Sequence, residues 1–338
     1  MYPVSILKPL KGVEEGLREN LQSFFDLDYP CYEIIFSIQH WTDPARALIE
    51  EMIQQNPQTA ARLLICEIDL GPNPKVNNLI LSYKKAKYDL LLISDSNVRV
   101  NRDYLKRQVA HLDTSVGMVT SVVAGQNAAG IGGNLEGVYL NTFYARWMEL
   151  TATFGHACVV GKSMLFRRST SERFGGIRIL ARYLAEDYMA GEAVRRLGLR
   201  IIIATDPIRQ YIGDYAFSTF WSRHLRWGRI RKSQAPLIFF AEPFFGAVLS
   251  GMLGCFGFAY YFGVSPFYAF ALHMSVWFLC DTLVAMELEP NPSSLFPLIW
   301  VVREFLALPL WFHTAIGKTV QWRGRSLTLK PGGLLEDS

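Results

Sequence analysis

The chain has 338 residues, of which 50% are hydrophobic and 19% are charged, below the share of about 25% charged residues usual in soluble proteins. Its net charge is +4, and it has no long basic stripe with interleaved aromatic residues, which argues against a nucleic-acid-binding protein. The apolar surplus gathers after Pro236, and this predicts a membrane region at the C-terminal end.

Short apolar runs alternate with amphipathic stretches from Pro3 to about Leu112. This alternation predicts a mostly parallel α/β sheet that binds a nucleotide beyond the C-terminal ends of its strands, in a domain over residues 1–236. The strands expected are Val4–Leu7, Glu33–Ile38, Arg62–Cys66 and Asp89–Ile93. The helices expected between them are Gly16–Phe25, Pro44–Gln55 and Val76–Lys85.

The middle of the chain is less regular. Five glycines between Gly125 and Gly137 suggest a loop that leads into an aromatic helix over Leu135–Thr151. A strand is expected at Cys158–Phe166. A further helix is expected from Tyr183 to Leu197, where Gly198 would end it.

Residues 237–320 contain three apolar segments, at Phe244–Phe262, Pro266–Met286 and Leu295–Ile316. The first two are long enough to cross a hydrocarbon core of about 30 Å. The third carries Arg303 and Glu304 near its middle, so we expect it to pack against the others, to re-enter, or to lie at the interface. A short polar tail is expected at 321–338.

Several observations bear on the side of the membrane. The five cysteines have no metal-ligand spacing, which favours reduced thiols and a cytosolic catalytic part. No signal peptide is predicted, since the strand-like Val4–Leu7 follows Met1 almost at once. The basic cluster Arg223–Lys232 and the tail should both be cytoplasmic, which favours two full spans.

The tripeptide Asp95-Ser96-Asn97 follows an apolar strand, where such a sheet presents its ligands. Asp95 could hold a divalent cation on a diphosphate, with Asn97 as a neutral oxygen ligand. These residue types also favour turns. On the tripeptide alone the turn is the better reading.

Glu186 and Asp187 open a predicted helix. Carboxylates in a first helical turn are ordinary partners of the helix dipole. The functional alternative is a general base that takes the proton of an acceptor hydroxyl. Asp187 is the candidate base, and Glu186 is the neighbour that orients it.

Arg223 and Arg226 are three residues apart on a helix that runs up to the apolar region, so they share a face. Two guanidinium groups on one face can grip a diphosphate, and Trp227 can wall a sugar or an acceptor. The alternative is a basic collar for anionic headgroups.

Two weaker candidates lie nearer the N-terminus. Asp43 follows the second predicted strand and could bind a nucleobase or ribose, or cap the helix that begins at Pro44. Lys75 could touch a phosphate, or be a solvated lysine.

The order of these residues carries more weight than any one of them. Asp43, Asp95, Asp187 and Arg223-x-x-Arg226-Trp227 resemble the D, D, D, (Q/R)xxRW series of inverting membrane glycosyltransferases. The further motifs Ile6-Leu7-Lys8-Pro9-Leu10-Lys11-Gly12, Asp26-Leu27-Asp28-Tyr29-Pro30, Asn73-Pro74-Lys75-Val76-Asn77-Asn78-Leu79 and Ala185-Glu186-Asp187-Tyr188 are similar to those of the ceramide glucosyltransferase family. The resemblance covers essentially the whole chain.

The resemblance implies a GT-A type domain, UDP-glucose as donor, a ceramide-like lipid as acceptor, and Mg²⁺ or Mn²⁺ as cofactor. Asp43 would contact the uridine, Asp95 the metal-diphosphate, and Asp187 would be the base. Donor and acceptor would be held by Arg223, Arg226 and Trp227. The sequence departs from the family at two positions, with His40 where an acidic residue is common and Asn97 where a second Asp is common.

Other functions remain open from the sequence. A related enzyme could use a hopanoid or diacylglycerol as acceptor, or UDP-N-acetylglucosamine as donor. A processive polysaccharide synthase would need more helices than three uncertain segments supply. A membrane protein that only binds lipid or nucleotide is disfavoured because Asp43, Asp95, Asp187 and the stretch Arg223-x-x-Arg226-Trp227 are all retained.

Overall fold

The computed structural model describes residues 2–156, 158–322 and 325–337. They form two compact units. The first unit comprises Met1–Val123 and Trp147–Tyr211, and the second comprises Ala124–Arg146 and Ile212–Ser338. The chain therefore passes between the units three times, twice within long strands, β6 (Val116–Ala129) and β8 (Arg200–Asp214).

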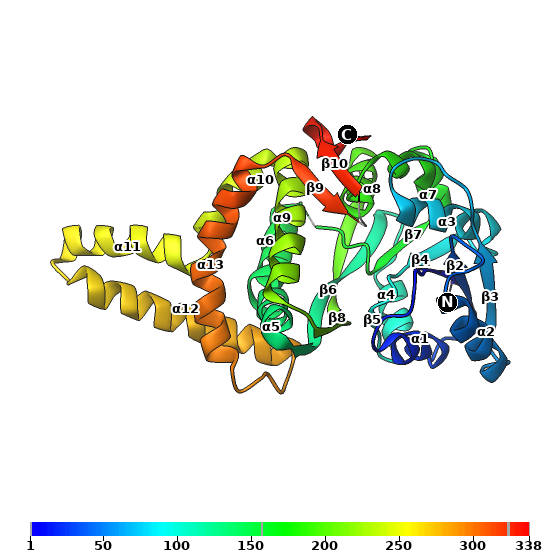
Figure 1. The fold of residues 1–338 in the computed structure, drawn as a ribbon, viewed down its shortest axis with the longest axis horizontal. Coiled ribbons are helices and arrows are strands. Elements are labelled where there is room, and N and C mark those ends of the chain that lie inside the picture. Colours follow the sequence, from blue (N-terminus) through cyan, green and yellow to red (C-terminus); the bar gives the residue numbers. More distant parts are fainter. Residues whose placement is uncertain (1, 157, 323–324, 338) are drawn as a thin grey trace. The chain divides into compact units, whose positions relative to one another are not determined.

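A single sheet organises the first unit (Figure 1), with strand order β3-β2-β1-β4-β7-β6-β8-β5. Its first four strands pair in parallel, which confirms the α/β prediction. Strand β7 pairs antiparallel with β4 and β6, and β5 pairs antiparallel with β8. The remaining strands are β1 (Val4–Pro9), β2 (Tyr32–Ile38), β3 (Ala60–Ile65), β4 (Leu90–Ile93), β5 (Val98–Arg99) and β7 (Met164–Arg167).

The central strands read as continuous apolar runs because helices cover both of their faces. Leu7, Ile35 and Leu91 are fully buried, and they pack with Leu79 in one core cluster. The helical elements of this unit are α1 (Leu17–Phe25), α2 (Ala45–Gln55), α3 (Pro74–Lys85), α4 (Tyr104–Ala110), α6 (Ala145–Thr153), α7 (Arg168–Glu172), η2 (Ile177–Arg182) and α8 (Glu186–Arg196).

The glycine-rich middle of the chain is not the loop that the sequence suggested. It forms the end of β6 and helix α5 (Gly130–Tyr139). A Cβ on Gly132 or Gly133 would collide with backbone atoms of residues 213–216, so these glycines permit close packing. The expected helix Leu135–Thr151 continues from α5 through a π-helical segment, η1 (Leu140–Tyr144), into α6.

The expected strand Cys158–Phe166 is also shorter than predicted, because β7 begins only at Met164. Before it, Val160 and Ser163 form an isolated antiparallel bridge around a turn. That turn carries Gly161, which is buried, and Lys162, which is partly buried.

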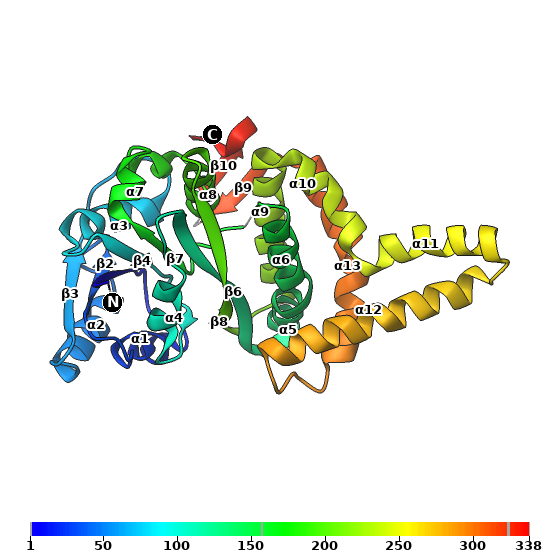
Figure 2. The same cartoon turned by 180° about the vertical axis from the view of Figure 1, so that it is seen from behind.

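The second unit contains the apolar helices (Figures 1 and 2). Two of them, α12 (Pro266–Leu288) and α13 (Phe296–Ile316), are long and apolar enough to cross a membrane. The predicted segment Phe244–Phe262 is broken at Gly246, where α10 and η3 meet α11 at a bend of 65°. The other helices are α9 (Phe217–Gln234), α10 (Pro236–Ala241), η3 (Glu242–Phe245) and α11 (Ala247–Phe262).

The charged residues within these apolar helices have partners. Asp281 is fully buried, 2.6 Å from Nε of Arg146 and 2.8 Å from the indole nitrogen of Trp300, which donates to it. Arg303 pairs with Glu304, which also accepts the N–H of Ala247 at 2.9 Å. Pairing removes much of the cost of placing such groups among apolar helices.

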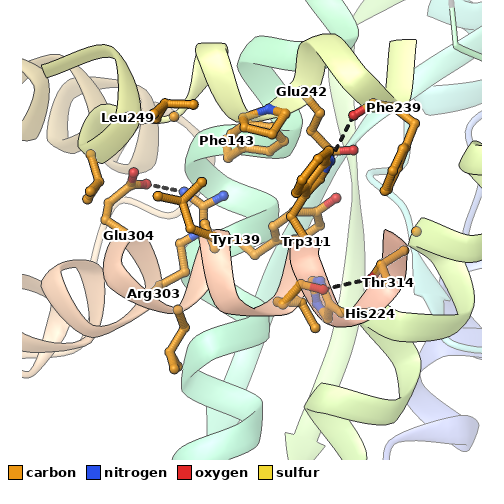
Figure 3. Close-up of a pocket in the computed structure, with 18 of the residues that line it drawn as sticks. Tyr139, Phe143, His224, Phe239, Glu242, Leu249, Arg303, Glu304, Trp311 and Thr314 are labelled. Atoms are coloured by element: carbon orange, nitrogen blue, oxygen red, sulfur yellow. Dashed lines mark hydrogen bonds and ion pairs between the residues drawn. The ribbon is translucent and has the colours of Figure 1, made fainter. Parts of the chain in front are cut away.

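A cavity of about 60 Å³ lies among α5, α9, α10, α11 and α13 (Figure 3). Aromatic rings form much of its wall, including those of Tyr139, Phe143 and Trp311. The ion pairs Arg231–Glu242, with 2.8 Å between Nη2 and Oε1, and Arg303–Glu304 also border it.

The polar tail expected at 321–338 belongs to a small antiparallel sheet of β9 (Thr319–Trp322), β10 (Arg325–Leu329) and β11 (Leu335–Asp337). Residues 323–324 and 338 of that tail lie outside the described residues. The ammonium of Lys232 donates to the carbonyls of Thr314, Ala315 and Gly317 at 2.6–3.3 Å. This contact fixes the end of α13 on α9.

We expect Asn78→Ala to destabilise the first unit. The Asn78 amide is buried and donates to the carbonyls of Leu10 and Ser37, both at 3.0 Å. Its loss should cost about 2 kcal/mol, or a fall of roughly 4–8 °C in the Tm of a unit of this size. A thermal melt in detergent measures it. The exposed Gln54→Ala on α2 is the control, and equal Tm values for the two variants would contradict the prediction.

Candidate active site

Asp95 lies just beyond β4, at the C-terminal edge of the parallel strands, as the sequence predicted. The side chain of Lys8, from the neighbouring strand β1, fixes the backbone there. Its ammonium donates to the carbonyl of Asp95 at 2.6 Å and to Ser94 Oγ at 3.3 Å. Complete burial lowers the pKa of Lys8 well below its usual value.

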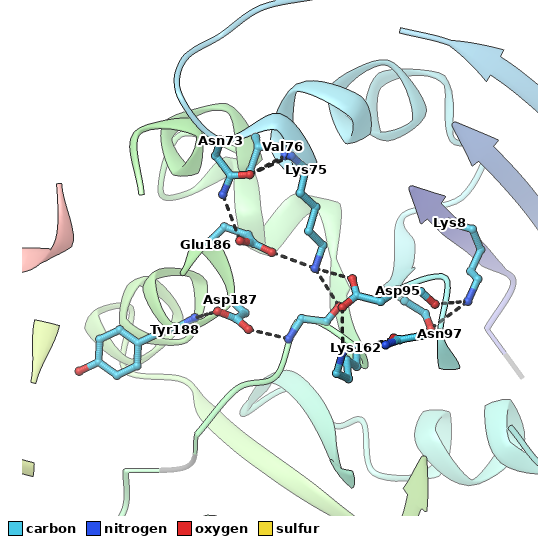
Figure 4. A network of polar contacts seen from close by, with 12 residues as sticks. Lys8, Asn73, Lys75, Val76, Asp95, Asn97, Lys162, Glu186, Asp187 and Tyr188 are labelled. Carbon is cyan, nitrogen blue, oxygen red and sulfur yellow. Dashed lines mark hydrogen bonds and ion pairs between the residues drawn. The ribbon is translucent and has the colours of Figure 1, made fainter. Parts of the chain in front are cut away.

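Lys75 joins three parts of the chain (Figure 4). Its ammonium lies 2.7 Å from Asp95 Oδ1 and 2.8 Å from Glu186 Oε1, and donates to the carbonyl of Gly161 at 3.1 Å. Burial opposes the charge on Lys75, but the nearby carboxylates outweigh burial and raise its pKa. Lys75 is therefore a charged component of the site and not the solvated lysine that the sequence left possible.

Local structure aims Lys75 at this place. Asn73 caps α3, accepting the N–H groups of Lys75 and Val76 at 2.9 and 3.2 Å. Its amide also donates to Glu186 Oε2 at 3.1 Å. The start of α3 and the start of α8 are thus tied through one side chain.

Lys162 also belongs to the site, although the sequence analysis did not identify it. Its ammonium lies 3.4 Å from Asp95 Oδ2 and 3.3 Å from Asn97 Oδ1. Burial would raise the pKa of Asp95, but Lys75 and Lys162 outweigh burial and bring it to about 2. Lys162 belongs to no motif and stood within an expected strand, so there was no reason to select it from the sequence. Its role becomes visible only because the structure has a turn before β7, which brings Lys162 to Asp95.

Glu186 and Asp187 have different surroundings in the first turn of α8. Glu186 pairs with Lys75, whereas Asp187 accepts the N–H of Gly161 at 2.8 Å through Oδ2 and that of Tyr188 at 2.8 Å through Oδ1. Burial, followed by the charge of Glu186, raises the pKa of Asp187 to about 6. A carboxylate with that pKa is basic enough to accept a proton near neutral pH.

Asp95 and Asn97 offer the hard oxygen atoms that Mg²⁺ or Mn²⁺ prefers. Both face the ammonium of Lys162, so the place between them already suits a cation. Among the described residues no three His, Cys, Asp or Glu side chains converge on a metal position. The two oxygen ligands of Asp95 and Asn97 fit a cation held jointly with the phosphates of a donor, which is common for Mg²⁺.

Asp43 lies outside the network around Lys75. Its Oδ1 accepts the N–H groups of Gly12 and Ala45, both at 2.9 Å. Asp43 thus fixes the loop after β1 against the start of α2, consistent with the capping reading of the sequence. Its proposed contact with uridine remains a prediction.

Arg223, Arg226 and Trp227 lie on α9 in the second unit. The guanidinium of Arg223 lies 5.0 Å from the ring of Trp227 and 3.3 Å from Glu136 Oε1. Glu136 also contacts His224 Nε2 at 3.0 Å. Burial would raise the pKa of Glu136, but His224 and Arg223 bring it to about 2.

Glu136 is fully buried and was not identified from the sequence. It stood in an expected aromatic helix with nothing to indicate a partner on α9. Its ionised carboxylate holds Arg223 in place.

Comparison with known proteins identifies the family. The family model for glycosyl transferase family 21 matches residues 1–335. The chain belongs to this family. The predicted family and enzyme class, a lipid glycosyltransferase, are thereby confirmed.

Two curated relatives illustrate the similarity. Ceramide glucosyltransferase 1 of Caenorhabditis elegans is 29% identical over 341 residues, covering 99% of this chain and 73% of that protein. Ceramide glucosyltransferase of Komagataella phaffii is 29% identical over 414 residues, covering 95% of this chain and 81% of that protein.

Among solved structures, the mannosyltransferase PcManGT from Pyrobaculum calidifontis, in complex with GDP-Man and Mn²⁺, has a TM-score of 0.54 at 16% identity. The match covers 93% of this chain and 84% of that chain. At this identity the likeness concerns the fold, and it confirms the predicted GT-A class.

We expect Gly161→Ala to impair sugar transfer without unfolding the protein. The new Cβ would lie 2.5 Å from the ammonium of Lys75 and 3.2 Å from Asp187 Oδ2, so the flexible lysine must move. A loss of at least about tenfold in kcat/KM, roughly 1.4 kcal/mol of transition-state stabilisation, is expected.

Steady-state kinetics beside a thermal melt would test this. Gly254→Ala is the control, since no atom lies within 4 Å of its Cβ position. Unchanged transfer by Gly161→Ala would show that the position of Lys75 does not matter.

Proposed function

We propose that this enzyme transfers glucose from UDP-glucose to the primary hydroxyl of ceramide, giving glucosylceramide with inversion at the anomeric carbon. The names of the curated relatives support the substrates. The observation that carries the chemistry is the arrangement around Lys75. It places a carboxylate with a pKa of about 6 beside a lysine-rich cluster suited to a diphosphate.

Asp187 is the general base in this proposal. As the ceramide hydroxyl attacks the anomeric carbon, Asp187 accepts its proton. The bond between that carbon and the β-phosphate oxygen breaks on the opposite face, and UDP leaves. Gly161 and Tyr188 hold the carboxylate of Asp187 in place through backbone N–H groups.

Lys75 and Lys162 receive the leaving diphosphate. Both ammonium groups contact the carboxylate of Asp95, so they already stand where a phosphate group would meet them. Positive charge fixed near a leaving group lowers the barrier without later reorganisation. The role predicted for Lys75 as a donor ligand is retained, and Lys162 is added to it.

A divalent cation, Mg²⁺ or Mn²⁺, would be held by Asp95 and Asn97 together with the donor phosphates. The PcManGT structure, which shares the fold, contains Mn²⁺ with GDP-Man. When bound, the cation would neutralise charge on the departing diphosphate.

The remaining predicted residues are assigned by their family positions. Asp43 would contact the uridine, while Arg223, Arg226 and Trp227 would hold donor and acceptor. We propose that the enzyme is an integral membrane protein with its catalytic unit on the cytoplasmic side. Membrane lipids would be its other partners.

A transfer assay on the purified protein tests the function. UDP-glucose, UDP-galactose and UDP-N-acetylglucosamine would each be offered with ceramide, diacylglycerol or a hopanoid. Glucosylceramide as the main product is expected. Another glycolipid would overturn the named substrates but keep the mechanism, whereas UDP binding without transfer to any lipid would favour a binding protein.

The pH profile should follow Asp187. Since the base works only when deprotonated, kcat/KM should be constant well above pH 6 and fall about tenfold per pH unit below it. Glu186→Gln removes a charge that raises this pKa, so its acid limb should move to lower pH. Asp187→Asn should bind UDP and fail to transfer sugar. A wild-type acid limb in Glu186→Gln would contradict this assignment.

Asp95→Ala should weaken the binding of UDP that depends on a divalent cation. Isothermal titration with UDP, in Mn²⁺ and then in EDTA, measures this dependence directly. The wild type should lose affinity in EDTA, whereas Asp95→Ala should bind equally weakly in both. An undiminished effect of EDTA in the variant would remove Asp95 from the metal site.

A further inference from the structure

Helices α11 and α12 form an antiparallel hairpin (Figures 1 and 2). No Asp, Glu, Lys or Arg occurs between Pro243 and Cys280. With 23 residues, α12 is about 34 Å long, enough to cross a hydrocarbon core of about 30 Å. Helix α11 has 16 residues and is about 24 Å long, and the uncharged turn 263–265 continues it towards the far side of that core. Exposed large apolar side chains extend along both helices, among them Phe256, Tyr260, Phe267, Leu272 and Leu283.

Helix α13 is also long and apolar enough to cross a membrane. Its contacts with α11 and α12, however, lie at the base of the hairpin. Trp300 bonds to Asp281, near the end of α12, and Glu304 bonds to the N–H of Ala247, the first residue of α11. Figures 1 and 2 agree that α13 crosses the ends of the hairpin and does not run along it.

Beyond the hairpin, α13 packs against α10 and α9. Trp311 donates to the carbonyl of Phe239 in α10 at 2.9 Å. Trp221 of α9 donates to His313 at 3.1 Å, and Lys232 reaches the last carbonyls of α13. If α13 crossed a bilayer, it would therefore carry the five cations of α9 into hydrocarbon, at a high cost.

The two faces of α13 are those of a helix that lies on a membrane. Its inner face buries Arg303, Glu304 and Thr314. Its outer face presents apolar residues at helical spacing, namely Leu298, Val302, Phe305, Phe312 and Ile316. Helix α10 and its extension η3 repeat this pattern with the exposed Leu237, Phe240 and Phe244.

We propose that the second unit meets a lipid bilayer in two ways. The α11–α12 hairpin crosses the bilayer, whereas α10 and α13 lie along the boundary between headgroups and acyl chains, with their outer faces in the lipid. The strands β9–β11, which follow α13, are then on the same side of the membrane as α9. This arrangement holds whichever sugar and acceptor the enzyme uses.

Cysteine labelling tests the number of crossings. Three single-cysteine variants are compared: one keeps only the native, exposed Cys31, and the other two lack all five native cysteines and carry either Ser265→Cys in the hairpin turn or Gln321→Cys in β9. A membrane-impermeant maleimide is then applied to sealed, uniformly oriented vesicles. Cys31 and Gln321→Cys should react from one side, and Ser265→Cys from the other.

Either of two results would overturn the proposal. Labelling of Gln321→Cys from the side opposite Cys31 would mean that α13 crosses. Labelling of Ser265→Cys from the same side as Cys31 would mean that the hairpin does not. A thermal melt of each variant verifies that it is folded, so a failed assignment of substrate leaves this test intact.

Spin-label depth measurements provide an independent check on α13. Labels at Leu298→Cys, Phe305→Cys and Phe312→Cys should report similar shallow depths, because a helix in the membrane plane keeps its outer face at one level. A label at Phe256→Cys, midway along α11, should be deeper and serves as the control. A steady change of depth along α13 would overturn the surface placement.

Discussion

The candidate active site depends on the contacts of one group, the ammonium of Lys75. It brings together the end of β4, the start of α8 and the turn before β7, which are far apart in the sequence. Because it pairs with Asp95 and Glu186, the remaining carboxylate, Asp187, is the one that keeps a raised pKa. One lysine thus divides three acidic residues into two kinds: Asp95 and Glu186, which pair with it, and Asp187, whose carboxylate accepts backbone N–H groups instead.

The site is richer in lysine than its acidic motifs imply. Lys8, Lys75 and Lys162 all approach Asp95, through its backbone or its carboxylate. Asn97 stands where a second Asp is common in the family, and the ammonium of Lys162 lies beside it. The positive charge that a donor diphosphate needs is partly built into the protein, which relieves the demand on a bound metal.

Much of this organisation could be predicted from the sequence, because parallel strands buried on both faces and amphipathic helices have distinct periods. The clustering of Asp95, Asp187 and Lys75 followed from their places near strand ends and helix starts. Lys162 and Glu136 could not be found in this way, because each acts through a partner brought near only by tertiary packing. The glycines Gly132 and Gly133 were misread for the same reason, since close approach of a distant backbone leaves no local pattern.

The discontinuous units also constrain how the protein is made. Helix α5 leaves the ribosome early, yet its residue Val138 packs with Ala247, Ala285 and Trp300, which are synthesised much later. Glu136 likewise pairs with residues of α9 that are synthesised later, Arg223 and His224. The first unit cannot close until residues 147–211 emerge, and an apolar helix must be kept from aggregating in the meantime. A chain cut before α11 would leave Val138 without these partners, so we expect such a fragment to expose an apolar helix even where its first unit is complete.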